Sequence, residues 1–229
     1  MNKANSIVSP NSAVRVAIIG AGALGQQMAQ HLRQSVNWAV VGFFDDLAAP
    51  GTATVNGPVL GRVEAIQEMF KTGAFDALLM GIGYNHLAVR QQLFEVLAPQ
   101  VPFACFIHPA AYVDASATVA PGCFVSPGCI LDLNVSLGPS TFLYPGCVLA
   151  HDTVLVGHSF LAPAVCLAGH VTVGPRCFLG IGTTVIDGVQ LGPDVQTGAG
   201  ATVVVNLIEP GLYVGAPAKK FGVGEVVQE

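Results

Sequence analysis

The hydrophobic positions in the second half of the chain recur every six residues. From Val113 to Val203, each sixth residue is Val or Leu, except for Thr197. A second six-residue series, from Ala117 to Ala201, contains only Ala, Cys, Ser, Thr and Val. An α-helix repeats about every 3.6 residues and a half-buried strand every 2. A period of six instead predicts a hexapeptide-repeat parallel β-helix, in which each hexad is a short strand followed by a turn.

A different pattern precedes this repeat. Strand-like and helical segments alternate, with strands expected at 14–20, 38–46, 75–83 and 101–108 and helices at 24–34, 63–71 and 85–98. This alternation predicts a parallel sheet with helices on its faces, in the order of half a dinucleotide-binding fold. We therefore expect a flexible tail (1–13), an α/β Rossmann-like domain (14–106), a β-helix domain (107–210) and a C-terminal extension (211–229).

Composition narrows the possible surroundings and partners. Charged residues make up 10% of the chain and hydrophobic residues 52%, and the mean hydropathy is +0.61. No apolar run reaches the roughly 18 residues of a membrane-spanning helix, so we attribute the excess to β-strands and to faces that pack in an oligomer. The net charge is −5 and no basic stripe is present, so we expect no nucleic-acid partner. The polar N-terminus lacks a signal peptide, which favours a cytoplasmic protein.

The six cysteines do not suggest a metal site. Four of them, Cys123, Cys129, Cys147 and Cys177, occupy the small position of the hexad, and no CxxC motif occurs. We interpret them as small buried residues in a reducing compartment. A zinc site needs three convergent ligands, and the histidine spacings do not stack three histidines. We therefore predict no bound metal.

One corner of the expected β-helix combines a histidine with a glycine. If three hexads form one coil, equivalent residues of successive coils stack, and two of the three corners carry prolines. The remaining corner reads Ala115, Leu133, His151, Gly169 and Asp187. Coils are about 4.8 Å apart, so the Gly169 backbone should lie beside His151. These residues could supply a general base and an oxyanion donor, with Asp152 orienting the imidazole. The alternative is that His151 is a surface turn residue; His158 and His170 fall on other lines.

The Rossmann-like segment contains a glycine-rich turn. GAGALG (20–25) matches G-x-G-x-x-G between a strand and a helix, and Asp45 and Asp46 follow about 25 residues later. Such glycines allow a phosphate to approach the backbone and the helix N-terminus, and the carboxylates could accept hydroxyl or base N–H groups. A structural turn and a redox dinucleotide site are the alternatives. The absence of a second mononucleotide half favours a nucleotide ligand over a redox dinucleotide.

Several stretches together resemble the bacterial hexapeptide-repeat sugar acetyltransferases. This group includes sialic acid O-acetyltransferases and the N-acetyltransferases of bacillosamine- and perosamine-type nucleotide sugars. The matching stretches are FFDD (43–46), GIGYN (81–85) with Arg90, FIHPAAYVDASA (106–117), LAHDTVLVG (149–157), LAGHVTVG (167–174), CFLGIGTTV (177–185), GAGATVVVN (198–206) and VGAPAKK (214–220).

The resemblance implies a left-handed β-helix, a homotrimer, and acetyl-CoA bound between neighbouring β-helices. It implies that His151 is the base, that Asp152 is its acidic neighbour and that the Gly169 amide contacts the thioester. The residues that it implies for acetyl-CoA binding are Gly180, Ile181, Gly182, Gly198, Ala199, Pro217 and Lys219. Those that it implies for nucleotide-sugar binding are Gly20, Ala21, Gly22, Asp45, Asp46 and Asn85.

The chain departs from the family pattern at three positions. Leu24 and Phe160 stand where the family often has histidines, and Val205 stands where it often has a lysine. By the resemblance, the first two positions lie near the acceptor sugar and bear on its identity. The third bears on the contacts to the CoA phosphates.

We predict an acetyl-CoA-dependent N-acetyltransferase that acts on a nucleotide-linked amino sugar in glycan biosynthesis. The nearest alternative is an O-acetyltransferase acting on a sialic acid or a related sugar. More distant alternatives are an NAD-dependent oxidoreductase and a non-catalytic nucleotide-sugar-binding scaffold.

Overall fold

The computed structural model describes residues 13–222 and divides them into two compact units. The first unit extends to Phe106 and includes Ala120–Cys123; the second contains Ile107–Val119 and the chain from Phe124 onward. The tail expected over 1–13 lies outside the described residues except for its last residue, and so does the part of the C-terminal extension after residue 222. Within 13–222, no helix is both long enough and apolar enough to cross a bilayer.

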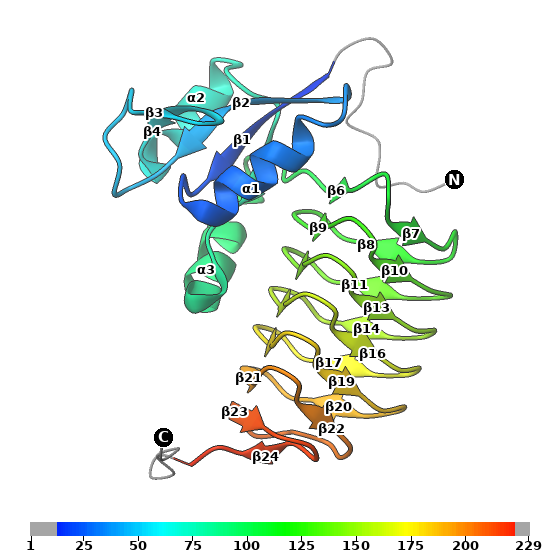
Figure 1. The fold of residues 1–229 in the computed structure, drawn as a ribbon. Helices are drawn as coiled ribbons and strands as arrows, with labels where there is room; N and C mark the ends of the chain where they lie inside the picture. Colours follow the sequence, from blue (N-terminus) through cyan, green and yellow to red (C-terminus); the bar gives the residue numbers. More distant parts are fainter. Residues whose placement is uncertain (1–12, 223–229) are drawn as a thin grey trace. The chain divides into compact units, whose positions relative to one another are not determined.

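The first unit contains a mixed five-stranded sheet (Figure 1) in the order β3-β4-β2-β1-β5. Four strands are parallel: β1 (Val14–Ile19), β2 (Trp38–Phe44), β4 (Gly57–Gly61) and β5 (Ala77–Met80). The short strand β3 (Ala53–Thr54) is antiparallel to β4. The sheet thus has the Rossmann-like arrangement expected from the alternating pattern, with one antiparallel edge added.

Helices pack on both faces of this sheet. Helix α1 (Ala23–Leu32) buries Met28, Ala29 and Leu32. On the other face, α2 (Ile66–Lys71) and α3 (Leu87–Leu97) share a core with Ala17 and Ile19 of β1. Two 3₁₀ turns precede these helices, η2 (Val63–Ala65) and η3 (Tyr84–His86). Alternate residues of β1 therefore face different helices, as the two-residue period of a strand requires.

The first unit differs from the sequence-based expectation in two places. The β3–β4 hairpin was not predicted, although Asn56-Gly57 is a strong turn signal, because its two strands are too short to show an alternating pattern. The strand expected over 101–108 is reduced to a bridge between Phe103 and Leu78 and to β6 (Phe106–Ile107). An apolar run alone does not show where a strand is interrupted.

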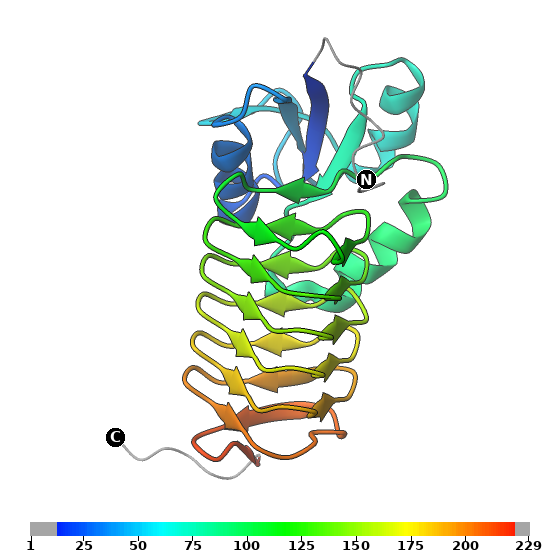
Figure 2. The same ribbon diagram turned by 90° about the vertical axis from the view of Figure 1, so that its right-hand side faces the viewer.

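The second unit is a left-handed parallel β-helix whose short strands stack in three sheets (Figure 2). The first sheet contains β7 (Tyr112–Val113), β10 (Ile130–Leu131), β13 (Val148–Leu149), β16 (Cys166–Leu167), β19 (Thr184–Val185) and β22 (Thr202–Val203). The second contains β8 (Thr118–Val119), β11 (Ser136–Leu137), β14 (Val154–Leu155), β17 (Thr172–Val173) and β20 (Gln190–Leu191). The third contains β6, β9 (Phe124–Val125), β12 (Phe142–Leu143), β15 (Phe160–Leu161), β18 (Phe178–Leu179), β21 (Val195–Thr197), β23 (Gly211–Val214) and β24 (Lys219–Lys220).

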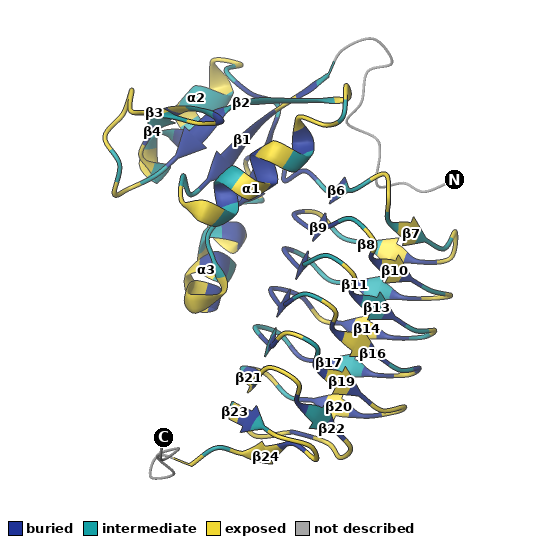
Figure 3. Ribbon diagram, viewed as in Figure 1, coloured by how far each residue is buried: buried dark blue, intermediate teal, exposed yellow. Residues whose placement is uncertain are grey.

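Strand register confirms that three hexads form one coil. Ile130 pairs with Val148, and Val148 pairs with Cys166, each step advancing by three hexads. The aliphatic position of the hexad is buried in every coil from Val125 to Val203, as the dark blue strand residues in Figure 3 illustrate. At the exceptional position, the buried Thr197 hydroxyl bonds to the Thr183 hydroxyl at 2.7 Å and accepts the Gly180 N–H at 3.0 Å. The polar substitution is therefore accommodated because its hydroxyl is hydrogen-bonded.

Side chains also stack along the outside of the third sheet. The rings of Phe124, Phe142 and Phe160 lie nearly parallel, with centroids 5.0 and 4.9 Å apart, and the ring of Phe178 continues the column at 6.0 Å. All four residues occupy the same position of successive coils. We call this column the phenylalanine ladder.

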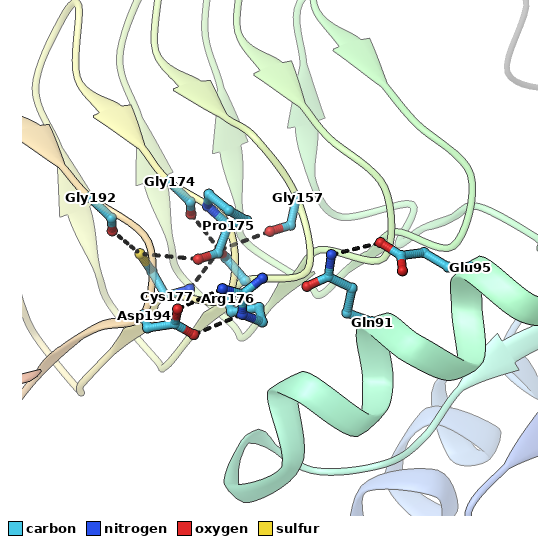
Figure 4. A network of polar contacts seen from close by, with 10 residues as sticks. Gln91, Glu95, Gly157, Gly174, Pro175, Arg176, Cys177, Gly192 and Asp194 are labelled. Carbon is cyan, nitrogen blue, oxygen red and sulfur yellow. Dashed lines mark hydrogen bonds and ion pairs between the residues drawn. The ribbon is translucent and has the colours of Figure 1, made fainter. Parts of the chain in front are cut away.

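Each unit also contains polar contacts between neighbouring turns or coils. Arg176 forms a two-pronged ion pair with Asp194 one coil away, at 2.7 and 2.6 Å, and Cys177 Sγ contacts the Gly192 carbonyl (Figure 4). Within α3, Gln91 donates to Glu95 one turn later. Burial raises the pKa of the Cys177 thiol to about 12, which keeps this core cysteine protonated.

Candidate active site

His151 lies on the turn between β13 and β14, where the backbone passes from the first sheet to the second through a left-handed residue, Asp152 (φ 60°). The Asp152 carboxylate lies 3.0 Å from His151 Nδ1 through Oδ2 and accepts the Asn134 side-chain amide at 3.0 Å through Oδ1. These two hydrogen bonds, that from His151 first, lower the pKa of Asp152. An ionised carboxylate at Nδ1 favours the tautomer with the proton on Nδ1, which leaves Nε2 as the basic nitrogen.

Gly169 lies directly beside the His151 ring, as the stacking of successive coils predicted. A Cβ added to Gly169 would be 2.7 Å from His151 Nε2 and 2.8 Å from Asp187 Oδ1. Any larger residue at this position would therefore force the His151 or Asp187 side chain to move. Among residues 13–222, no acceptor pairs with the Gly169 N–H, so this donor is available to a ligand. The corner thus brings together a basic nitrogen and an unpaired backbone donor.

His170 also belongs to this cluster, which the sequence analysis did not anticipate. Its Nδ1 lies 3.9 Å from Asp152 Oδ2, and its ring centroid is 5.0 Å from that of His151 in an edge-to-face arrangement. The backbone N–H of His170 donates to the His151 carbonyl. His170 follows the corner residue Gly169 by one position. Because the sequence analysis compared only the corner residues of successive coils, it did not place His170 next to His151. The signal that could have found it is its position one full coil after Asp152.

The residues expected to bind acetyl-CoA lie at the C-terminal end of the β-helix. Ile181 and Ala199 occupy the same corner in successive coils, where the Gly200 N–H donates to the Ile181 carbonyl, and Ile181 is 58% exposed. Gly180 and Gly198 each allow a close approach of the next coil, because an added Cβ would lie 2.5 Å from the Thr197 carbonyl oxygen and 2.9 Å from Val214 respectively. These two glycines therefore also have a packing role.

The C-terminal extension packs against the same end. Strand β24 is antiparallel to β23, and the Ala218 N–H donates to the Thr202 carbonyl of the last coil. Pro217 and Lys219 on either side of Ala218 are exposed. Gly182, which follows Ile181 on its corner, adopts a left-handed φ of 66° with open space where a Cβ would be.

The first unit contains a cavity of about 250 Å³ at the carboxyl ends of β1 and β2. Three of the residues expected to bind the nucleotide sugar line it: Gly20, Asp45 and Asp46. Its other lining residues, which sequence reasoning missed, are mainly apolar: Ile19, Phe44, Leu47, Val63, Ile82, His86, Val89 and Leu93. Ala21, Gly22 and Asn85 are not part of this lining. An apolar cavity with two carboxylates at a strand end has the character of a small-molecule site.

The two carboxylates differ in what they already bind. Asp45 accepts three backbone N–H groups, from Ala21 at 2.8 Å, Leu47 at 2.8 Å and Ala48 at 3.0 Å. Burial alone would raise its pKa, but these three donors outweigh burial and lower it. Asp46 is exposed and accepts one backbone N–H, from Val63 at 2.9 Å. Asp45 therefore stabilises the turn, and Asp46 retains acceptor capacity for a ligand.

The glycines of the GAGALG turn differ in whether the fold requires them. Gly20 has a φ of 100°, and a Cβ on Gly25 would lie 2.0 Å from the Gly20 carbonyl oxygen, so both are required for the strand–helix packing. Gly22, at the N-terminus of α1, has open space where a Cβ would be. Asn85 lies on η3 and is exposed.

Comparisons with known proteins agree with this architecture. The family model described as the PglD N-terminal domain matches residues 15–97. Comparison with curated proteins returns no significant match. A solved structure of PerB from Caulobacter crescentus in complex with CoA and GDP-perosamine is 34% identical with a TM-score of 0.83, covering 90% of this chain and 97% of that chain.

Two further solved structures are similar over nearly the same length. A variant of perosamine N-acetyltransferase from Caulobacter crescentus, with CoA and GDP-perosamine, is 32% identical with a TM-score of 0.83, covering 90% of this chain and 96% of that chain. The acetyltransferase domain of PglB from Neisseria gonorrhoeae FA1090 with acetyl coenzyme A, at 24% identity and a TM-score of 0.81, covers 91% of this chain and 100% of that chain and shares the fold. The chain is 34% identical to PerB over 90% of its own length, with the same fold. It therefore belongs to the bacterial hexapeptide-repeat sugar acetyltransferase family.

Proposed function

We propose that the protein transfers the acetyl group of acetyl-CoA to the amine of a nucleotide-linked amino sugar. The observation that carries this proposal is the corner of the β-helix, where Asp152 orients His151 beside the unpaired N–H of Gly169. The two Caulobacter structures, at 32% and 34% identity, contain CoA and GDP-perosamine and so support both substrate classes. Membership of an acetyltransferase family argues against the NAD-dependent oxidoreductase.

His151 acts as the general base in the proposed reaction. The sugar amine attacks the thioester carbonyl carbon while His151 Nε2 accepts the proton that the amine loses. The Gly169 N–H donates to the oxyanion of the tetrahedral intermediate. The intermediate then collapses, the C–S bond breaks, and the CoA thiolate leaves and takes up the proton from His151. Asp152 stabilises the imidazolium that exists between these two proton transfers.

We propose that the cavity of the first unit holds the nucleotide of the acceptor. Asp46 accepts a hydrogen bond from a hydroxyl or base N–H group, and the apolar lining contacts the base. The space at Gly22 and the N-terminus of α1 suits the phosphates. We place the reaction in the cytoplasm, in the biosynthesis of a surface glycan.

The active form in this proposal is a homotrimer with acetyl-CoA between neighbouring β-helices. Exposed apolar side chains support it: Leu133 (53%) and Ile186 (43%) adjoin the His151 corner, and Ile181 (58%) lies on another corner. Isolated apolar side chains are common on protein surfaces, but Leu133 and Ile186 flank the proposed reaction site. In addition, the proposed base and the residues expected to bind acetyl-CoA lie on different corners of one chain. A neighbouring subunit would place its acetyl-CoA-binding residues beside the base of the first subunit.

Replacement of His151 by Ala tests the mechanism. Loss of a general base lowers kcat about 10²–10⁴-fold, while KM for acetyl-CoA should change little. The assay follows release of free thiol from acetyl-CoA with GDP-, UDP- and dTDP-linked amino sugars. Light scattering on both proteins should give a mass three times 23.5 kDa. A variant with more than about a third of the wild-type kcat would reject His151 as the base, and a monomeric active enzyme would reject the intersubunit site.

A further inference from the structure

His151, Asp152 and His170 are the only three His, Cys, Asp or Glu side chains within 13–222 whose donor atoms converge closely enough to hold a metal ion. One donor atom of each lies within 4.8 Å of the others. Two imidazoles and a carboxylate are ligands that Zn²⁺ binds readily. The proposed acetyl transfer uses His151 and Asp152 but leaves His170 without a role.

The distances suit a tetrahedral ion. Bonds of about 2.0–2.1 Å to nitrogen and oxygen place two zinc ligands about 3.3 Å apart. Asp152 Oδ2 lies 3.0 Å from Nδ1 of His151 and 3.9 Å from Nδ1 of His170, one slightly below and one slightly above that value. Small side-chain rotations would bring Oδ2 to this spacing from both nitrogens, and one donor atom of each residue already lies within 4.8 Å of the others.

The surroundings favour an ion at this point. The Asn134 amide holds the other carboxylate oxygen, Oδ1, at 3.0 Å, which orients Asp152 with Oδ2 toward the His151 imidazole. The side chains of His151, His170 and Asp152 are 48%, 60% and 39% exposed, so an ion can enter and keep a water as its fourth ligand.

We propose that His151, Asp152 and His170 form an inhibitory zinc site that blocks acetyl transfer. The inhibitory effect rests on the proposed function and follows from the tautomer of His151. A neutral imidazole that binds zinc through Nδ1 carries its proton on Nε2. In that form Nε2, the nitrogen beside Gly169, cannot accept a proton from the amine. The ion also takes Asp152 away from the imidazole that it orients.

Calorimetric titration of the metal-free full-length protein with Zn²⁺ alone, at neutral pH, tests the site without any substrate. We expect one zinc ion per chain in the micromolar range. His170→Asn should weaken this binding at least about tenfold, because it removes one of three ligands. Cys166→Ser removes the exposed thiol, and His108→Gln removes a histidine outside the cluster; both should bind zinc as the wild type does.

Inhibition is measured separately, by the loss of thioester absorbance of acetyl-CoA at increasing zinc concentration. Wild type should lose activity over the range in which zinc binds, and a chelator should restore it. Relative to its own rate without zinc, His170→Asn should need at least about tenfold more zinc for inhibition than the wild type does. Absence of saturable binding, or equal binding by His170→Asn, would overturn the site, whether or not the protein proves to be an acetyltransferase. Zinc bound at this site without inhibition would overturn its inhibitory role.

Discussion

At the scale of single residues, the proposed chemistry depends on a glycine as much as on a histidine. Gly169 lies between His151 and Asp187, and a methyl group there would require one of these two side chains to shift. The general base and the unpaired N–H are thus adjacent because one residue lacks a side chain. This explains how a repeat that is otherwise uniform can have one reactive corner.

Replacement of Gly169 by Ala should therefore impair catalysis without unfolding the protein. The new Cβ would lie 2.6 Å from His151 Cε1 and 2.8 Å from Asp187 Oδ1, so the imidazole must move. We expect kcat to fall at least about tenfold, because a misplaced base loses its alignment with the amine. Gly83→Ala is the matched control, since its added Cβ meets no atom within 4 Å. Unchanged kcat in Gly169→Ala would show that the ring position is not critical.

Residue-level prediction from the sequence succeeded where backbone periodicity sets the position. His151 and Gly169 were expected to be neighbours because they occupy the same corner of successive coils, which are closely spaced. It failed where a turn sets the direction of a side chain. Asp152 was expected to orient His151, but His170, which has a similar left-handed φ of 58° one coil later, was not expected to point toward the same imidazole. The three hydrogen bonds of Asp45 were equally invisible, because they depend on how the chain turns after β2.

Asp45 provides a residue-scale prediction that depends on pH. Folding lowers its pKa, so its stabilising effect is present above the unfolded-state pKa of about 4 and is lost as the pH falls through the lower folded value. Asp45→Asn should lower the thermal midpoint at neutral pH. The difference from wild type should shrink as the pH is lowered below about 4. A difference that stays constant with pH would mean that the charge of Asp45 does not contribute.

At the scale of elements, the six-residue period predicted the β-helix strands well because every coil buries the same two positions. The outward-facing positions do not have to be small or aliphatic, so their sequence shows no six-residue pattern. For this reason the sequence did not reveal the phenylalanine ladder. Its members recur once per coil, a period that becomes informative only when the coil length is known. Phe160, identified as a departure from the family pattern, is a buried member of this ladder.

The ladder predicts unequal costs for similar substitutions. Phe142 stacks between two rings and is 2% exposed, whereas Phe178 lies at the end of the column and is half-buried. Phe142→Ala should destabilise the protein by about 3–5 kcal/mol, and Phe178→Ala by clearly less. Thermal unfolding followed by circular dichroism measures both. Equal decreases in the thermal midpoint would indicate that neither the deeper burial nor the second stacked ring of Phe142 adds to stability.

At the scale of the whole molecule, the two candidate sites belong to different compact units. The His151 corner is built by the β-helix, and the cavity with Asp46 is built by the Rossmann-like unit. The division was visible in the sequence because the hydrophobic period changes near residue 107. The cavity lining was not visible, since Leu47, Val63 and His86 come from separate turns that only the fold brings together.

The separation predicts that acceptor binding and acetyl-CoA binding can be changed independently. Asp46→Asn keeps the size of the side chain but removes a charged acceptor, whose hydrogen bonds contribute about 1.5–3 kcal/mol. We expect KM for the nucleotide sugar to rise about tenfold or more and KM for acetyl-CoA to stay the same. Asp76→Asn, which removes an exposed carboxylate paired with Arg15 elsewhere in the same unit, is the matched control and should leave both KM values unchanged. Saturation curves for both substrates measure the effect. If KM for acetyl-CoA rises instead, or neither value moves, the cavity beside the glycine turn does not hold the acceptor and Asp46 has only its structural bond to Val63.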